Sequence, residues 1–230
     1  MELYHKFYLK SKKEQNLVLF GIGMIASMLN LGVLIVAFMS GMWLLPILSV
    51  AITLSVIAPF FDTPSLKEHG KLIYYSPLFL AENERGGVVT VHGGTLFDYL
   101  YVLDRSQNGK QRTNSIIISY LEGILKLIET YEGKDHASVK VRGTTYILNE
   151  RTAQRIGFRK VETDVLQKLL LVYNYIQLTL SNSIAKAKLS FPNLKQIHTF
   201  EASMSDLIRR KKLIIELDKK LKKQLPVMHK

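Results

Sequence analysis

The stretch that decides the fold is "LVLFGIGMIASMLNLGVLIVAFM" at residues 17–39, which continues past Ser40 and Gly41 into "MWLLPILSVAITLSVIAPFF". The whole run from Leu17 to Phe61 contains no Asp, Glu, Lys, Arg or His. As a helix the first stretch would rise about 34 Å, enough for a hydrocarbon core of about 30 Å. The second stretch adds about 20 residues, enough for another span. Because backbone amides inside a bilayer need partners within the protein, the run predicts two transmembrane helices joined by a tight turn.

A secretory signal peptide is the main alternative for an apolar stretch near the N-terminus. Its apolar region would be shorter and would end at a small-residue cleavage site, whereas this run is followed by a second span. A retained hairpin over residues 17–61 is therefore expected. Pro46 and Pro59 are expected to bend or end the second helix, and Trp43 suits the aromatic belt at the turn. Asn30 is expected to serve helix packing, since no ionisable residue marks an ion path.

The charges on either side of the hairpin predict its orientation. Residues 1–16, a basic flank, carry a net charge of +2, and the 169 residues after Phe61 carry +10 of the chain's total of +12. By the positive-inside rule both termini face the cytoplasm and only the turn crosses. The expected location is the bacterial inner membrane, as a multi-pass protein. The absence of cysteine excludes thiol catalysis, disulfides and cysteine metal sites.

After the hairpin the pattern changes to that of a mixed, α/β or α+β, cytoplasmic domain over residues 62–200. Segments rich in β-branched and aromatic residues predict three strands in series, at 71–82, 88–93 and 95–103. From Thr113 apolar residues recur at helical spacing and predict an amphipathic helix that ends at Gly133.

The rest of this domain completes the predicted order β-β-β-α-β-α-β. Residues 137–148 predict a fourth strand, "NERTAQRIG" predicts a short helix with Asn149 as its cap, and residues 158–162 predict a last strand. The fold class is thus a membrane-anchored α/β (α+β) protein, with a two-helix transmembrane hairpin, one mixed domain and C-terminal helices.

This element order resembles the central and C-terminal part of the GNAT acyltransferase superfamily, over residues 71–162. Members commonly carry an "N..A" pair before a "GF" dipeptide, and Asn149, Ala153, Gly157 and Phe158 match that pattern. The resemblance implies acyl-CoA as the cofactor. In that family backbone N–H groups at the start of the main helix hold the pyrophosphate of the cofactor.

The corresponding turn in this chain is "RSQNGKQRTN", at residues 105–114. The resemblance makes Gly109, Lys110 and Arg112 the candidate residues for the acyl-CoA pyrophosphate. The turn departs from the family's Gln/Arg-x-x-Gly-x-Gly/Ala pattern because it has one glycine. The tyrosine that often serves as general acid is also missing, since Tyr146 lies on the preceding strand, and no catalytic residue is assigned.

Other candidate sites in the sequence are weaker. His92 and Asp98 flank Gly93 and Gly94 in "HGGTLFDY", where a ligand could approach the backbone, but a turn between two strands explains these glycines without a ligand. The six histidines do not have the spacing of a metal site, so no metal is expected. The sequence contains no Walker A motif, nucleophile elbow or dinucleotide fingerprint.

The segment "VLQKLLLVYNYIQLTLSNSI", residues 165–184, is too polar for an easy third span. It predicts a helix that lies along the membrane interface or packs on the domain and the hairpin, and a plain core helix is the alternative. Residues 189–202 predict a loop and a short strand, because Pro192 excludes a continuous helix.

The C-terminal residues, 201–230, predict a basic amphipathic helix from Ser205 to Leu225, with Ser205 as its cap. Beside an apolar stripe this helix carries eight basic residues: Arg209, Arg210, Lys211, Lys212, Lys219, Lys220, Lys222 and Lys223. Anionic membrane lipids are the first partner that this surface predicts, and a partner helix on the stripe is the second. Nucleic acid is third because no aromatics are interleaved. A solvated helix face is the alternative without a partner.

Two classes of function stay open. The first is a non-catalytic component or scaffold of a membrane-associated assembly, without a cofactor, which binds a protein partner or a second copy of the chain through its hairpin and cytoplasmic domain. The second is a membrane-associated N-acyltransferase that uses acyl-CoA. The first is favoured because the residues that would perform the chemistry are degenerate or absent. An unfilled, V-shaped opening between the strands at 95–103 and 137–148 that faces the helix start near Arg112 would favour the second.

Overall fold

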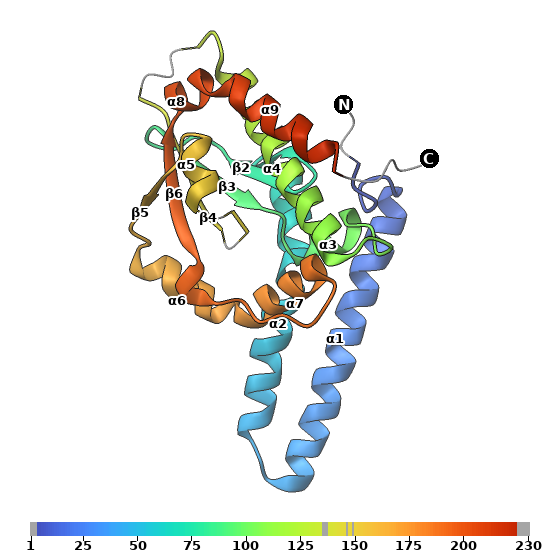
Figure 1. The fold of residues 1–230 in the computed structure, drawn as a ribbon. Coiled ribbons are helices and arrows are strands. Elements are labelled where there is room, and N and C mark those ends of the chain that lie inside the picture. The colour runs from blue at the N-terminus through green and yellow to red at the C-terminus, as the bar shows by residue number, and fades with distance from the viewer. Residues whose placement is uncertain (1–3, 135–137, 146, 149, 225–230) are drawn as a thin grey trace.

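Two long helices extend as a hairpin from a domain that is built on one mixed sheet (Figure 1). The computed structural model describes residues 4–134, 138–145, 147–148 and 150–224. Helix α1 covers Lys12–Ser40 and α2 covers Leu44–Glu68, and Gly41 forms the turn between them with a φ of +73°. Both helices are long and apolar enough to cross a membrane. Only 6% of the most apolar window of α1 and 17% of that of α2 are buried, so most of this surface has no cover within the chain.

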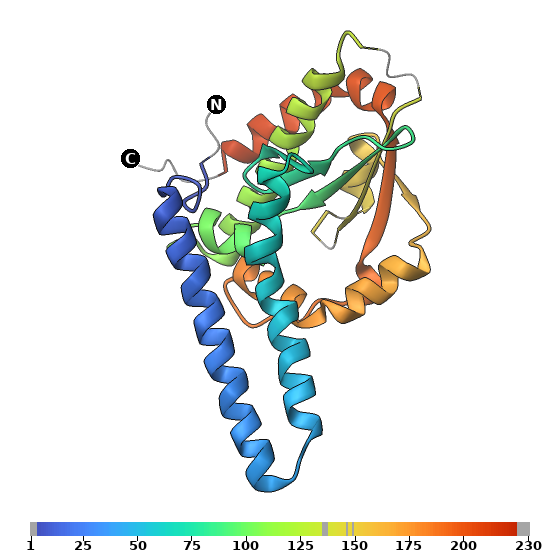
Figure 2. The same cartoon turned by 180° about the vertical axis from the view of Figure 1, so that it is seen from behind.

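Six strands of the described residues form the sheet, in the order β1-β2-β3-β4-β6-β5. They cover Leu72–Ser76 (β1), Phe79–Glu82 (β2), Val88–Gly93 (β3), Lys140–Thr145 (β4), Arg159–Val161 (β5) and His198–Ser203 (β6). Only β3 and β4 are parallel neighbours among them. Parallel neighbours need a long crossover, which is supplied here by two helices, α3 (Leu96–Val102) and α4 (Gly109–Tyr131) (Figure 2).

Helix α4 packs on one face of the sheet and forms the main core with it. Its apolar side chains lie with Phe79 and Val91 in one buried cluster. Gly123 allows the close approach, because a Cβ there would lie 2.5 Å from the Phe79 side chain. The other helices are α5 (Glu150–Arg155), α6 (Val165–Tyr173), α7 (Tyr175–Lys186), α8 (Met204–Arg209) and α9 (Lys211–Lys222), and a 3-10 turn, η1, covers Leu194–Gln196.

The predicted third strand at 95–103 is wrong, because this segment forms helix α3. Thr95 Oγ1 accepts from the backbone N–H of Asp98, and the Asp98 carboxylate accepts from the backbone N–H of Thr95. This capping box satisfies donors at the helix start and outweighs the β propensity of the aromatic residues that follow. The predicted single strand at 71–82 is instead two strands, β1 and β2, separated by a turn at residues 77–78.

Helix α2 does not end at Pro59, one of the positions predicted to bend or end it. It continues through Pro59 and Pro64 to Glu68. A proline inside a helix costs about 3 kcal/mol. Burial compensates this cost, since Pro59 is buried and the neighbouring Phe60 packs with Phe97 of α3 in a second apolar cluster. The last turns of α2 therefore belong to the domain.

The later elements match the predicted types with shifted boundaries. The amphipathic helix starts at Gly109 rather than Thr113, and the strands predicted at 137–148 and 158–162 are present as β4 and β5. Tyr146 and Asn149 lie outside the described residues, so the predicted cap is untested. The predicted C-terminal helix is two helices that meet at Arg210, and its cap is Ser203, whose Oγ accepts from Asp206 N, rather than Ser205.

The hairpin is held together and attached to the domain at both ends. Across the hairpin Ser49 Oγ donates to Asn30 Oδ1 at 2.8 Å, which agrees with the packing role predicted for Asn30. At its start, the segment before α1 returns to the domain, where Phe7 is fully buried against Phe97. At its end, α2 leads into β1 after only three residues. The hairpin and the sheet are thus one packed body.

Candidate functional site

The two parallel strands of the sheet part at their carboxyl ends. β3 and β4 lie opposite each other only as far as Val91 and Gly143. From there β3 stays paired with β2 through Gly93, and β4 stays paired with β6 through Thr145. In open α/β sheets, ligands commonly bind at the carboxyl ends of strands where neighbours diverge. The parting strands leave an opening whose first edge is β3 and not the segment 95–103.

A tyrosine from α4 fills this opening. A Cβ at Gly93 would overlap the Tyr120 hydroxyl, so the glycine makes room for the ring. The hydroxyl is hydrogen-bonded with Tyr99 and Thr145, and burial raises the pKa of Tyr120 to about 12. The phenol therefore stays protonated near neutral pH. A cavity of only about 40 Å³ is left on the α4 side of the opening.

A larger cavity, of about 460 Å³, lies on the face of the sheet opposite α4. Most of its walls come from the end of α2, the sheet and the pair α6–α7, and Tyr99 of α3 and Tyr120 of α4 also line it. The lining includes Leu66, Lys71, Arg85, Gln167, Leu171 and Ser181. Pockets for small ligands usually enclose about 300 to 1,000 Å³ and combine apolar walls with a few polar groups, so both the size and the lining are typical of a ligand site.

The polar groups of this cavity include one paired histidine. His92 Nε2 lies 2.9 Å from Glu82 Oε1, and both side chains are partly exposed to the cavity. A carboxylate that holds an imidazole in place can support proton transfer to or from a bound ligand. Lys71 and Arg85 line the same cavity and give it positive charge. His92 and Asp98 are close in sequence, but the structure pairs His92 with Glu82.

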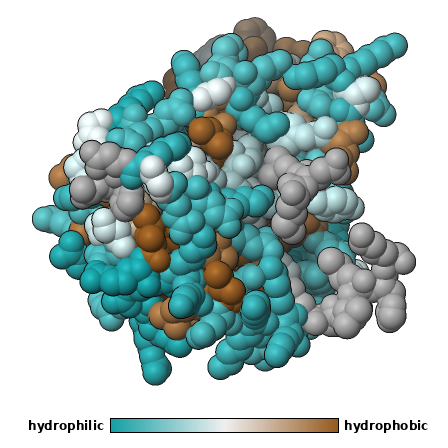
Figure 3. Space-filling model, turned by 90° about the horizontal axis from the view of Figure 1, so that it is seen from above, coloured by the Kyte–Doolittle hydropathy of each residue, from teal (hydrophilic) through white to brown (hydrophobic). Residues whose placement is uncertain are grey.

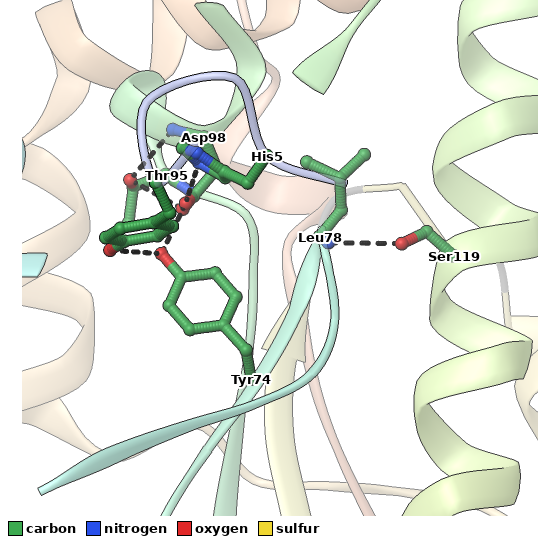
Figure 4. A network of polar contacts seen from close by, with 7 residues as sticks. His5, Tyr74, Leu78, Thr95, Asp98 and Ser119 are labelled. Atoms are coloured by element: carbon green, nitrogen blue, oxygen red, sulfur yellow. Dashed lines mark hydrogen bonds and ion pairs between the residues drawn. The ribbon is translucent and has the colours of Figure 1, made fainter. Parts of the chain in front are cut away.

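Asp98, which does not line the cavity, instead forms a buried polar network, shown in Figure 4. Its Oδ1 accepts from the Tyr74 hydroxyl at 2.5 Å and lies 3.2 Å from His5 Nε2. Its Oδ2 accepts from the backbone N–H and the hydroxyl of Thr95, at 2.7 and 2.8 Å. Burial, reinforced by the adjacent carboxylate, raises the pKa of Tyr74 far above its ordinary value. Asp98 is fully buried and its oxygens are occupied, so its role is structural.

The three residues predicted for a pyrophosphate lie at the start of α4, against the end of α7. A Cβ at Gly109 would overlap the carbonyl of Lys186, so this glycine serves helix packing. The Arg112 guanidinium donates to three backbone carbonyls, those of Asp104, Arg105 and Ile184. Lys110 is exposed. The anion site stays a prediction, and the structure gives Gly109 and Arg112 a second role in joining α4 to α7.

The predicted basic surface lies on α8 and α9, at the end of the domain away from the hairpin tip (Figure 1). Half of its residues have partners: Arg209 pairs with Asp206, Arg210 donates to two carbonyls, Lys211 pairs with Glu132, and Lys222 pairs with Glu122 and Asp218. The structure shows no ion pair within the described residues for Lys212, Lys219, Lys220 and Lys223.

The apolar stripe of the basic segment is used inside the chain. Leu207 and Ile214 are fully buried, and Leu217 and Leu221 pack against the same core. A partner helix can therefore not bind this stripe without displacing it from α4. Figure 3, a view from above onto this end of the domain, shows a mostly hydrophilic surface. The lipid partner stays a prediction.

We expect Tyr120→Phe to change how stability depends on pH. The pKa of Tyr120 is about 12 in the folded chain, above its ordinary value of about 10. The contribution of Tyr120 to the free energy of unfolding is therefore complete below about pH 10 and is lost as pH rises toward about 12. Phenylalanine should lower the melting temperature at neutral pH, since hydrogen bonds worth about 1 kcal/mol are lost. It should also flatten the alkaline decline. Equal declines in both proteins would contradict a buried, protonated Tyr120.

Comparisons with known proteins and a search for metal ligands add no further assignment. No family model, curated protein or solved structure matches this chain at a significant level. No cluster of three His, Asp or Glu side chains suited to a metal ion occurs in the part of the chain that the structure describes. Any function is therefore inferred from the geometry of the cavity and from the hairpin.

Proposed function

We propose that this chain is a membrane-anchored binding protein. The hairpin spans a bilayer, and the domain holds a small ligand in the 460 Å³ cavity as a component of a membrane-associated assembly. One observation carries this proposal: α2 is at once half of the apolar hairpin and, through Thr63 and Leu66, a wall of the cavity. Anchor and ligand site are parts of one packed unit, which suits a protein that binds its ligand at a membrane surface.

The walls of the cavity indicate a ligand with an anionic group and an apolar part. Lys71 and Arg85 contribute two positive charges, while the only lining carboxylate among the described residues, Glu82, is paired with His92. Apolar walls come from α2, α6 and α7. Charge-assisted hydrogen bonds are stronger than neutral ones, so the cations would contribute much of the affinity for a phosphate or carboxylate group.

The proposed membrane arrangement places both ends of the chain on one side, in the cytoplasm of a bacterium with the hairpin in its inner membrane. The support is the excess of Lys and Arg on both flanks of the hairpin. The natural chain has no cysteine, so Met42→Cys at the turn and Lys219→Cys on α9 report position without background. An impermeant thiol reagent added to intact cells should label the first and not the second. Labelling of both, or of Lys219→Cys alone, would contradict the arrangement.

The ligand proposal predicts that the full chain, extracted gently from its native membrane, carries a small molecule that native mass spectrometry can identify. Ser181 is buried on α7 and lines the cavity, so Ser181→Trp should fill the space and remove the bound molecule. Ser106→Trp, at an exposed loop position, is the matched control. Arg85→Gln should weaken binding about tenfold or more, because a hydrogen bond to a charged group contributes about 1.5–3 kcal/mol. Equal retention by all variants would place the ligand elsewhere.

An acyl transferase is the second candidate, and the parting of β3 and β4 is the observation that favours it. Backbone groups at a diverging pair of strands can bind the carbonyl oxygen of a thioester, and His92 with Glu82 could accept the proton of an attacking amine. The carbonyl carbon would form a bond to the amine nitrogen as its bond to the thiolate sulfur breaks. Tyr120 in the opening and the covered start of α4 are the observations that rank this candidate second.

A thermal-shift titration tests the transferase. If the start of α4 binds a pyrophosphate, acyl-CoA at a hundred times its dissociation constant should stabilise the solubilised full chain by about 2.7 kcal/mol. Arg112→Gln and Gly109→Ala should abolish that shift. Since both substitutions lower the stability of the chain without ligand, each variant is compared with the natural chain by its ligand-induced change and not by its melting temperature. Lys195→Gln on η1 serves as a charge-matched control. No shift with acetyl-CoA or a long-chain acyl-CoA would exclude this chemistry and leave the binding proposal standing.

A further inference from the structure

Helix α6 presents an apolar face away from the domain. None of its residues is buried, and Val165, Leu169 and Val172 are 72%, 62% and 60% exposed. Gln167 and Leu171, one turn apart, point the other way and line the cavity. A helix on a water-facing surface normally shows the reverse pattern, with its polar side outward. The core-helix alternative for residues 165–184 is therefore wrong for α6.

More exposed apolar side chains follow in the connection between α7 and β6. Leu189 is 74% and Phe191 is 65% exposed. In Figures 1 and 2 this connection and α6 both lie at the end of the domain from which the hairpin emerges. The opposite end is mostly hydrophilic (Figure 3). The exposed apolar surface of the domain is thus gathered beside the exposed apolar surface of the hairpin.

A contact with α2 sets the level of α6 along the hairpin. Ser55 Oγ donates to the carbonyl of Tyr173, at the end of α6, over 3.5 Å. The charge-free run of α2 continues to Phe61, which lies about 9 Å further along the helix at about 1.5 Å per residue. Between the hairpin turn and Ser55, α2 contains only the residues from Leu44 to Leu54, which is about 17 Å of helix. This length is shorter than a hydrocarbon core of about 30 Å. A bilayer that covers the apolar run must therefore also reach α6.

We propose that the outer face of α6 lies in the lipid headgroup region and forms a second membrane contact beside the hairpin. Interfacial helices lie about 5–10 Å below the boundary, which agrees with the offset between Ser55 and Phe61. Lys168, the charged residue within α6, can extend its stem toward the headgroups. The bilayer is the occupant that fits, because this surface continues that of the hairpin. The inference rests on the proposed membrane span.

This arrangement makes α6 a partition between bilayer and cavity. Its outer side chains would contact lipid, while Gln167 and Leu171 face the ligand space. Arg85 lies at the other end of the sheet, because it forms a backbone bridge with Val88 at the start of β3. Thr145, which also lines the cavity, lies at the end of β4, and β3 and β4 are parallel. The cavity therefore extends away from the membrane, from the α6 partition toward its cations.

Fluorescence of single-cysteine variants of the full chain tests the contact. Each variant carries an environment-sensitive probe and is reconstituted in nanodiscs of phosphatidylglycerol and phosphatidylethanolamine, with quenching by spin-labelled lipid and by aqueous iodide as readouts. Leu166→Cys, Leu169→Cys and Val172→Cys should be quenched by lipid and protected from iodide. Gln167→Cys, on the cavity side of the same helix, should be shielded from lipid, and Lys219→Cys on α9 should be quenched by iodide. All replaced outer residues are exposed, so the fold should tolerate them.

Ile35→Cys in α1 separates this inference from the membrane proposal. If lipid quenches Ile35→Cys but iodide quenches Leu169→Cys, the hairpin is inserted and the α6 contact is wrong. If iodide quenches both, the proposed span itself fails. Leu169→Cys that is open to iodide in nanodiscs but protected in native membranes would show a protein partner on α6, and this result would also overturn the proposal.

Discussion

The arrangement of this molecule depends on one buried carboxylate. Asp98 accepts from groups of three separate parts of the chain, namely the segment before the hairpin, strand β1 and the start of α3. A buried carboxylate without such partners would cost several kcal/mol, so each donor keeps its segment in place. Through His5 the entrance of the hairpin is joined to α3, and through Tyr74 the strand that follows its exit is joined to the same group. The hairpin and the domain therefore share one buried polar network.

The candidate site follows from how the crossover after β3 is packed. The parallel strands part, as they do where many α/β sheets bind ligands, but Tyr120 occupies the gap and the start of α4 lies against α7. Both positions that would suit a nucleotide-like cofactor are therefore covered. The space that is open lies on the other face of the sheet, where α2, α6 and α7 enclose it with His92 and Glu82. This face lies next to the apolar surfaces of α2 and α6. Its position favours a ligand with an apolar part over a water-soluble cofactor.

The parts of the fold that local pattern could predict are those in which neighbours in sequence determine the outcome. The charge-free run predicted two apolar helices, and β-rich segments predicted β3, β4, β5 and β6, whereas the segment 95–103 was misassigned because its aromatic residues suit strands. The Thr95–Asp98 capping pattern could have predicted the start of α3. The burial of Asp98 could not be predicted in this way, because it depends on His5, which is 93 residues away. His92 was noted in the sequence, but a turn without a ligand was the preferred explanation of that stretch. Glu82 was not a candidate, since its contact with His92 depends on the register between β2 and β3.

The two attachments of the hairpin have a mechanical consequence. Phe7 and His5 hold the start of the hairpin to α3, and three residues connect α2 to β1, so both ends of the hairpin are closely attached to the domain. Helices in a bilayer tilt when their apolar length exceeds the local thickness. If the hairpin spans a bilayer as proposed, its tilt would be passed to the sheet through these two attachments. Bilayer thickness would thus set the angle at which the domain, its cavity and its basic end face the aqueous side.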